Sequence, residues 1–246
     1  MTCGCNGSGR SSRRVKNKSY CFLLGTLLWV AVTIFAGSAR AAGGAHIVDD
    51  SEVETPGTCH VELWVADFVP GDGYANIAPA CTSLKMPWLE IGAAYAHYWD
   101  QTIAGPLIGP QFKINFQPAS KGVGVGLALN AGVNARTGDL GLAGLIGLVT
   151  IPVTEKFRIN VNGGWSYLRG DNPTAFFWGG QVEVDVGWDV TLMMEAFGRQ
   201  PGVIGNQMGL RYTPAAHPRF DFDLLVGTTY DTTNTKFFTL GVTVRF

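Results

Sequence analysis

The sequence predicts an all-β chain, an up-and-down antiparallel β-barrel of about twelve strands, from three observations. Apolar and polar residues alternate with period two through most of the chain after residue 57, which is typical of strands with one apolar face. Turn residues separate these stretches at short intervals, with no helical period between them. Finally, 46% of the 246 residues are hydrophobic and only 15% are charged. Yet no apolar run beyond the N-terminus approaches the ~18 residues of a membrane helix.

The first 41 residues have the composition of a cleaved signal peptide. Five basic residues between Arg10 and Lys18 precede an apolar core at 20–37, and an A-x-A cleavage site ends at Ala41. An uncleaved membrane anchor is the alternative, because the apolar core is long. Residues 42–57 are small and acidic and contain proline and glycine, so we expect a flexible periplasmic leader there, followed by a barrel over 58–246.

Removal of this export signal makes the chain acidic. The signal carries six of the 18 basic residues and none of the 19 acidic ones, so 12 basic residues remain against 19 acidic ones and the net charge becomes −7. No basic stripe is left to neutralise phosphates. We therefore expect no nucleic-acid partner.

The two cysteines that remain after cleavage frame a predicted hairpin. Residues 59–67 and 74–81 alternate on either side of a proline- and glycine-containing turn at 70–73. Antiparallel pairing about this turn brings Cys59 beside Cys81, and an exported chain meets an oxidising compartment. We therefore expect a disulfide, the alternative being two free thiols in a cytosolic chain.

From Trp88 onward, alternating segments are separated by turns. Together with the hairpin they give twelve strands, with ten as the alternative, and sequential pairing of an even number of strands closes a barrel without a free edge. The further strands, with ends good to about two to four residues, are expected at 88–99, 104–117, 122–136, 139–152, 156–169, 174–187, 189–200, 203–214, 218–231 and 235–246.

Such a barrel is either soluble, with its apolar face inside, or a membrane barrel with that face outside. The export signal favours the membrane barrel. So does the polar face, which is rich in glycine and asparagine rather than in the lysine and glutamate of a solvated surface. Aromatic residues also gather toward strand ends, as an interfacial girdle requires. They are Trp88, Tyr98, Trp99, Trp165, Tyr167, Phe176, Trp178 and Trp188.

The last strand, KFFTLGVTVRF at 236–246, ends in the aromatic residue Phe246. With the export signal, the cysteine-framed hairpin and the stretch IPVTEKFRINVNGGW at 151–165, it resembles the Gram-negative outer-membrane β-barrel proteins, whose C-terminal signature Phe246 matches. Within them, the chain looks similar to transporters associated with phenol-degradation meta pathways. The resemblance implies location in the bacterial outer membrane, lipid and the barrel-assembly machinery as partners, and uptake of small hydrophobic or aromatic molecules.

Twelve charged residues are expected on the face that a membrane barrel turns inward. They either line a pore and set its selectivity or pair into a network that fills a narrow lumen, because unpaired buried charge is unfavourable. These lumen residues are Glu62, Glu90, Lys113, Arg136, Arg158, Glu183, Asp185, Glu195, Arg211, Asp221, Asp223 and Arg245.

Arg245 is placed to join the two ends of the barrel. In a closed barrel, its strand lies between the strand that carries Asp221 and Asp223 and the first strand, which carries Glu62. We therefore expect Arg245 to bridge the closure seam through Asp223 or Glu62.

The sequence offers no set of residues for catalysis. Barrel enzymes need a Ser–His–acid set or paired acids near the outer rim. Only His97 approaches that rim, and its place in the alternation points it toward lipid. No G-x-S-x-G motif, spaced His/Cys cluster or phosphate loop occurs. We therefore expect no enzymatic activity, no cofactor and no metal.

Two functions of different classes remain. The first is a channel or transporter for small molecules, and the second is a sealed structural or assembly barrel with a charge-paired lumen that binds a partner. The loops are short, which disfavours a large recognition surface. Small residues on the inward face leave room for a narrow channel, so the first function is favoured.

Overall fold

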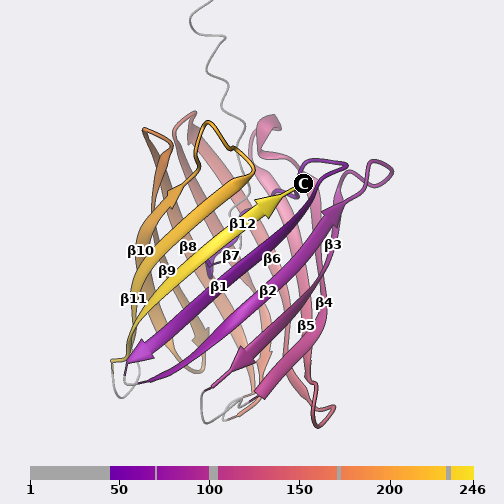
Figure 1. Ribbon diagram of the computed structural model, residues 1–246, viewed down its shortest axis with the longest axis vertical. Helices are drawn as coiled ribbons and strands as arrows, with labels where there is room; N and C mark the ends of the chain where they lie inside the picture. Colours follow the sequence, from indigo (N-terminus) through magenta and orange to yellow (C-terminus); the bar gives the residue numbers. More distant parts are fainter. Residues whose placement is uncertain (1–44, 70, 100–104, 171–172, 231–233) are drawn as a thin grey trace, which may run out of the picture. The chain divides into compact units, whose positions relative to one another are not determined.

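The protein is a closed barrel of antiparallel strands (Figure 1). The computed structural model describes residues 45–69, 71–99, 105–170, 173–230 and 234–246. In these ranges twelve strands pair in chain order, and β1 closes the barrel against β12. The strands are β1 (Cys59–Val69), β2 (Asp72–Thr82), β3 (Leu89–Tyr98), β4 (Gly105–Gln117), β5 (Gly124–Asn134), β6 (Leu140–Thr154), β7 (Phe157–Leu168), β8 (Thr174–Gly187), β9 (Val190–Gln200), β10 (Ile204–Tyr212), β11 (Phe220–Tyr230) and β12 (Lys236–Arg245).

The twelve-strand prediction is confirmed, and the ten-strand alternative is wrong. The strand count was predictable because each strand is a separate alternating stretch bounded by turn residues. The short helix η1 (Ala119–Lys121) interrupts the connection between β4 and β5. The predicted signal peptide at 1–41 lies outside the described residues.

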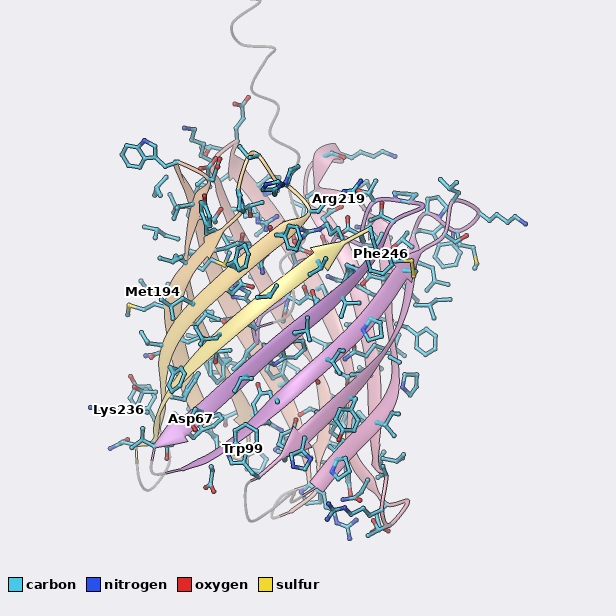
Figure 2. The ribbon with its side chains drawn as sticks, viewed as in Figure 1. Asp67, Trp99, Met194, Arg219, Lys236 and Phe246 are labelled. Carbon is cyan, nitrogen blue, oxygen red and sulfur yellow. A yellow bond between two sulfur atoms is a disulfide. The ribbon has the colours of Figure 1, made fainter. Side chains whose placement is uncertain are left out.

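The alternation places apolar side chains on the outer wall and polar ones in the lumen. In β12, Leu240 is 51% exposed whereas its neighbour Thr239 is only 2% exposed. The same holds on β9, where Met194 points away from the barrel (Figure 2) while Glu195 is buried. A wall that is apolar outside and polar inside matches a lipid-embedded barrel and is the reverse of a soluble one.

Aromatic side chains are exposed near the strand ends, as the girdle prediction requires. Trp99, Trp165 and Trp188 are among them. Tyr98 is a correction, because it takes the inward side of β3 and its ring stacks on that of Tyr74 with the centroids 5.0 Å apart. Within the described part of the chain, no helix is both long enough and apolar enough to cross a bilayer.

The predicted disulfide is confirmed. Cys59 and Cys81 face each other in the register of β1 and β2 and are covalently joined. The cross-link lies at the end of the barrel where the chain enters its first strand. At the same end, His60 of β1 pairs in register with Arg245 of β12. The closure seam and the disulfide therefore flank the same strand.

Candidate functional site

The lumen contains a stretch of chain that the sequence analysis expected outside it. Residues 45–57, here called the internal segment, precede β1. Residues 45–54 are buried or half-buried against the inner faces of the strands, and residues 55–57 are exposed. The expectation of a flexible periplasmic leader is therefore corrected for these residues. Residues 42–44 lie outside the described residues. The correction has a physical basis, because the lumen offers partners for both the main chain and the acidic side chains of the segment.

Polar side chains of the wall satisfy the main-chain amides of the internal segment. The segment has no strand partner, and a buried amide without a hydrogen-bond acceptor is strongly unfavourable. One wall side chain, that of Asn162, bonds to both main-chain groups of Asp49: its Oδ1 accepts from the amide, and its Nδ2 donates to the carbonyl at 2.8 Å. The amide hydrogen bonds run from Val48 N to Glu195 Oε2 (2.7 Å), from Asp49 N to Asn162 Oδ1 (2.8 Å), from Ser51 N to Thr150 Oγ1 (2.9 Å) and from Glu54 N to Glu90 Oε2 (2.8 Å).

An apolar contact anchors the start of the internal segment. Val48 is fully buried and forms a cluster with Phe197 and Phe237, and Ile47 packs against the same cluster. Gly179 of β8 leaves the space for Val48, since a Cβ at this position would lie 2.6 Å from Val48 Cγ2. This small core lies inside the barrel, where the inner wall is otherwise mostly polar.

The acidic side chains of the internal segment meet basic side chains of the wall. Their partners come from three separate strands, β4, β7 and β12. These contacts are charge-assisted, and they draw the segment against the wall from several sides. Asp49 Oδ1 lies 2.9 Å from Lys113 Nζ, Asp50 Oδ2 lies 3.4 Å from Arg158 Nη1, and Glu54 Oε2 lies 2.7 Å from Arg245 Nε.

The wall also carries ion pairs of its own. Arg158 and Arg245 also contact acids of the internal segment, and Asp223 lies beside His46, so the segment and the wall form one charge network. Buried charges are tolerated when they are paired in this way. The wall pairs are Arg158 Nη2 with Glu183 Oε2 (2.6 Å), Arg211 Nε with Asp223 Oδ1 (2.8 Å) and Arg245 Nη2 with Asp221 Oδ2 (2.6 Å).

Ten of the twelve charged residues expected in the lumen lie on its inner wall: Glu62, Glu90, Lys113, Arg158, Glu183, Glu195, Arg211, Asp221, Asp223 and Arg245. The other two are corrections. Arg136 is exposed in the turn after β5, because that strand ends at Asn134 and the alternation stops there. Asp185 is exposed near the end of β8, where its carboxylate accepts a hydrogen bond from the Gly187 amide.

The partners expected for Arg245 are also corrected. Its guanidinium bonds to Asp221 of β11 and Glu54 of the internal segment, not to Asp223 or Glu62. The register of β11 and β12 explains the difference. Asp221 pairs with Thr243, two residues from Arg245, whereas Asp223 pairs with Gly241, four residues from Arg245. Arg211 takes Asp223 instead.

His46 lies between two buried carboxylates. Its Nδ1 is 3.6 Å from Glu195 Oε1, and its Nε2 is 3.5 Å from Asp223 Oδ1. Burial by itself lowers the pKa of the imidazole, but the two carboxylates outweigh burial and raise that pKa from 6.5 to about 9. A protonated His46 therefore adds one positive charge to the internal segment. Within the described ranges, no three His, Cys, Asp or Glu side chains are arranged to hold a metal ion.

A cavity of about 510 Å³ remains beside the internal segment. Its wall comes mainly from β1 to β7, where inward small residues such as Ala78, Gly92, Ala128 and Gly144 leave the space open. Trp64 and several aliphatic side chains line part of it, and charged side chains line another part. The arrangement can hold a small molecule that has both an apolar and a polar portion.

A comparison with protein families matches residues 30–246 to the family described as Uncharacterised conserved protein UCP029691. The chain belongs to this family. A search of curated proteins finds no match.

Solved structures with the same fold as this member of the UCP029691 family are outer-membrane porins and channels. The KdgM porin has a TM-score of 0.61 at 8% identity, covering 76% of this chain and 99% of that chain. The NanC porin has a TM-score of 0.58 at 8% identity, covering 75% and 98%. The COG4313 outer membrane channel from Pseudomonas putida F1 has a TM-score of 0.55 at 8% identity, covering 80% and 97%. The predicted likeness to outer-membrane barrels is thus confirmed for the fold.

Sequence reasoning missed the residues of the internal segment that enter the lumen. His46, Asp49, Asp50 and Glu54 were assigned to a solvated leader. One signal was present, because the apolar pair Ile47–Val48 interrupts an otherwise small and acidic stretch. An apolar pair followed by acids suits a lumen with an apolar patch and basic side chains, but those lumen features are assembled only when distant strands come together.

Proposed function

We propose that this chain is an outer-membrane channel that passes small molecules through a lumen constricted by its internal segment. The observation that carries this proposal is the cavity of about 510 Å³ inside a closed barrel with an apolar outer wall. Three proteins of the same fold are named porins or channels, which supports the class. Export by the signal at 1–41 and insertion by the barrel-assembly machinery into outer-membrane lipid belong to the same proposal.

The solutes proposed are small, with hydrophobic or aromatic character. The cavity supports this class because Trp64, Ile146, Leu148 and Phe177 contribute to its lining. Such side chains favour apolar groups, whereas the polar groups of the lining fix the orientation of a solute. No catalytic step is part of the proposal.

The internal segment acts as the constriction. Its acidic side chains form ion pairs with Lys113, Arg158 and Arg245, three basic side chains that would otherwise face the lumen. It therefore reduces both the cross-section of the lumen and the positive charge along it. A solute must pass through the space that the segment leaves, or the segment must shift.

A second candidate is a sealed structural barrel that binds a partner. The ion-pair network favours it, because Arg158, Arg211 and Arg245 are all paired with wall carboxylates. In this case the internal segment completes a packed interior, and the cavity does not communicate with both ends of the barrel.

Conductance in a planar lipid bilayer tests both candidates. The wild-type protein is compared with an Asp49→Asn, Asp50→Asn variant, which weakens the contacts with Lys113 and Arg158. The control is Asp185→Asn, which removes an exposed acid that does not contact the segment. Discrete current steps that increase in the double variant, and not in the control, support the constricted channel. Silence from all three folded proteins contradicts the channel and supports the sealed barrel.

A further inference from the structure

One side of the cavity carries an excess of negative charge. Three carboxylates, those of Asp49, Glu62 and Glu90, line it together with the ammonium group of Lys113. Two other basic side chains line the cavity but are held by other partners, His46 beside Glu195 and Asp223, and Arg199 by Ser166 and the Pro173 carbonyl. The Lys113 ammonium is already paired, because its Nζ lies 2.9 Å from Asp49 Oδ1. Glu90 accepts a hydrogen bond of 2.8 Å from the Glu54 amide. The remaining carboxylate, Glu62, has no comparable partner.

Glu62 lies on the inward face of β1, with its side chain 18% exposed. The nearest basic atom is His60 Nε2, 3.8 Å from Glu62 Oε1, which is too long for a hydrogen bond. Among the described residues, no group donates a hydrogen bond to this carboxylate. A carboxylate withdrawn from bulk water is unfavourable without donors or a counter-charge. Glu62 is therefore suited to a cationic group.

His60 gives an independent indication at the same place. His60 is only 8% exposed and lines the cavity. Its Nδ1 makes no hydrogen bond within the described part of the chain. The closest carboxylate oxygen to Nδ1 is that of Glu54, at 3.9 Å. Buried polar atoms in folded proteins are almost always bonded, so an unpartnered nitrogen on a residue that lines a cavity indicates a polar ligand.

The apolar part of the cavity lies beside this acidic part. Trp64 follows Glu62 by two residues on β1, so both side chains take the inward face. Ile146 and Leu148 of β6 line the cavity as well. An indole near a carboxylate favours a cation, through its π face as well as through apolar contact. The volume of about 510 Å³ falls in the ordinary range of small-molecule sites.

We infer that this cavity binds a small amphiphilic cation, an aromatic or aliphatic body that carries a protonated amine. The amine is held by the Glu62 carboxylate, and the body packs against Trp64, Ile146 and Leu148. An anionic solute is disfavoured beside Glu62, because it would meet the Glu62 and Glu90 carboxylates there, while the Lys113 ammonium is already paired with Asp49. The inference deepens the proposed function by naming the class of solute, and it rests on that function for the route into the cavity.

Isothermal titration calorimetry of the folded barrel in detergent micelles tests the inference with three probes of nearly equal size. Phenethylamine carries the positive charge, 2-phenylethanol is its neutral counterpart, and phenylacetate carries a negative charge. Titration into empty micelles corrects for partitioning. We expect phenethylamine to bind the wild-type protein at least about tenfold more tightly than either other probe, because only the amine pairs with Glu62. Equal binding of the three probes would overturn the inference.

Glu62→Gln locates the site. This variant keeps the shape of the side chain and removes its charge, so the preference for phenethylamine should disappear. The control is Glu155→Gln, which removes an exposed acid in the turn before β7 and should keep the preference. A persistent preference in folded Glu62→Gln would contradict the assignment. The comparison of probes on the wild type remains decisive if the variant does not fold.

Calorimetry does not require a conducting barrel, so the two proposals fail separately. A protein that prefers the amine in micelles but is silent in a bilayer supports the binding site and contradicts the channel. A protein that conducts but binds the three probes equally supports the channel and contradicts the cation site.

Discussion

Nε of Arg245, on the last strand, lies 2.7 Å from Oε2 of Glu54, in the segment that precedes the first strand. The same guanidinium donates to Asp221 of β11 at 2.6 Å. Since Arg245 also pairs in register with His60 of β1, it lies at the seam where the barrel closes. One side chain thus connects the closure of the barrel with the filling of its lumen.

Arg245→Ala should lower the free energy of unfolding by about 2 kcal/mol, the usual size for loss of a hydrogen bond to a charged group. The substitution removes charge-assisted hydrogen bonds to the fully buried Asp221 and to Glu54, and breaking a largely buried ion pair is strongly destabilising. Urea unfolding of the protein folded in lipid vesicles measures the loss. Arg219→Ala is the control, since Arg219 is exposed in the turn before β11. Equal stability of Arg245→Ala and the control would contradict a structural role for the seam contact.

Gly179→Ala should displace the internal segment. The added Cβ would lie 2.6 Å from Val48 Cγ2, and overpacking of this kind is destabilising by about 1–3 kcal/mol. We expect the amides of residues 47–51 to exchange with deuterium at least about tenfold faster, as measured by mass spectrometry. Gly180→Ala is a matched control, because a Cβ there meets no atom within 4 Å. Unchanged protection in Gly179→Ala would show that the segment accommodates the methyl group.

Removal of the disulfide should destabilise the barrel by about 2–4 kcal/mol, as is typical of native cross-links. Cys59 and Cys81 are separated by 22 residues and join β1 to β2 beside the closure seam. Urea unfolding of Cys59→Ser, Cys81→Ser is compared with that of the wild type, with and without a reductant. The reductant should destabilise the wild type alone. An effect of similar size on the double variant would indicate that the reductant acts elsewhere.

The contribution of His46 to stability should depend on pH. The folded-state pKa of about 9 lies above the ordinary value of 6.5, so the stabilisation is fully present below pH 6.5 and is lost as the pH rises through 9. Its size is on the order of 3 kcal/mol. Unfolding free energies of the wild type and His46→Gln are compared between pH 6 and pH 10. The two curves should converge at the alkaline end, and a constant gap would contradict an ionised His46.

The barrel follows from local features of the amino-acid sequence. Each strand carries its own alternation, and pairing between sequence neighbours needs only short turns, so local pattern was enough to predict the twelve strands. The same local register placed Cys59 opposite Cys81 and turned ten of the twelve expected charges inward. Arg136 and Asp185 were expected in the lumen but are exposed, Arg136 in the turn after β5 and Asp185 near the end of β8, because alternation does not show where the covered part of the lumen ends.

The filling of the lumen, in contrast, depends on contacts between distant parts of the chain. Residues 45–57 have no period, and from sequence their acids match those of a solvated leader. They are drawn inside because Lys113, Arg158 and Arg245 come together from β4, β7 and β12 once the barrel closes. The contact of Arg245 with Glu54 depends on the same closure. Such contacts join residues far apart in the chain, and no local pattern encodes them.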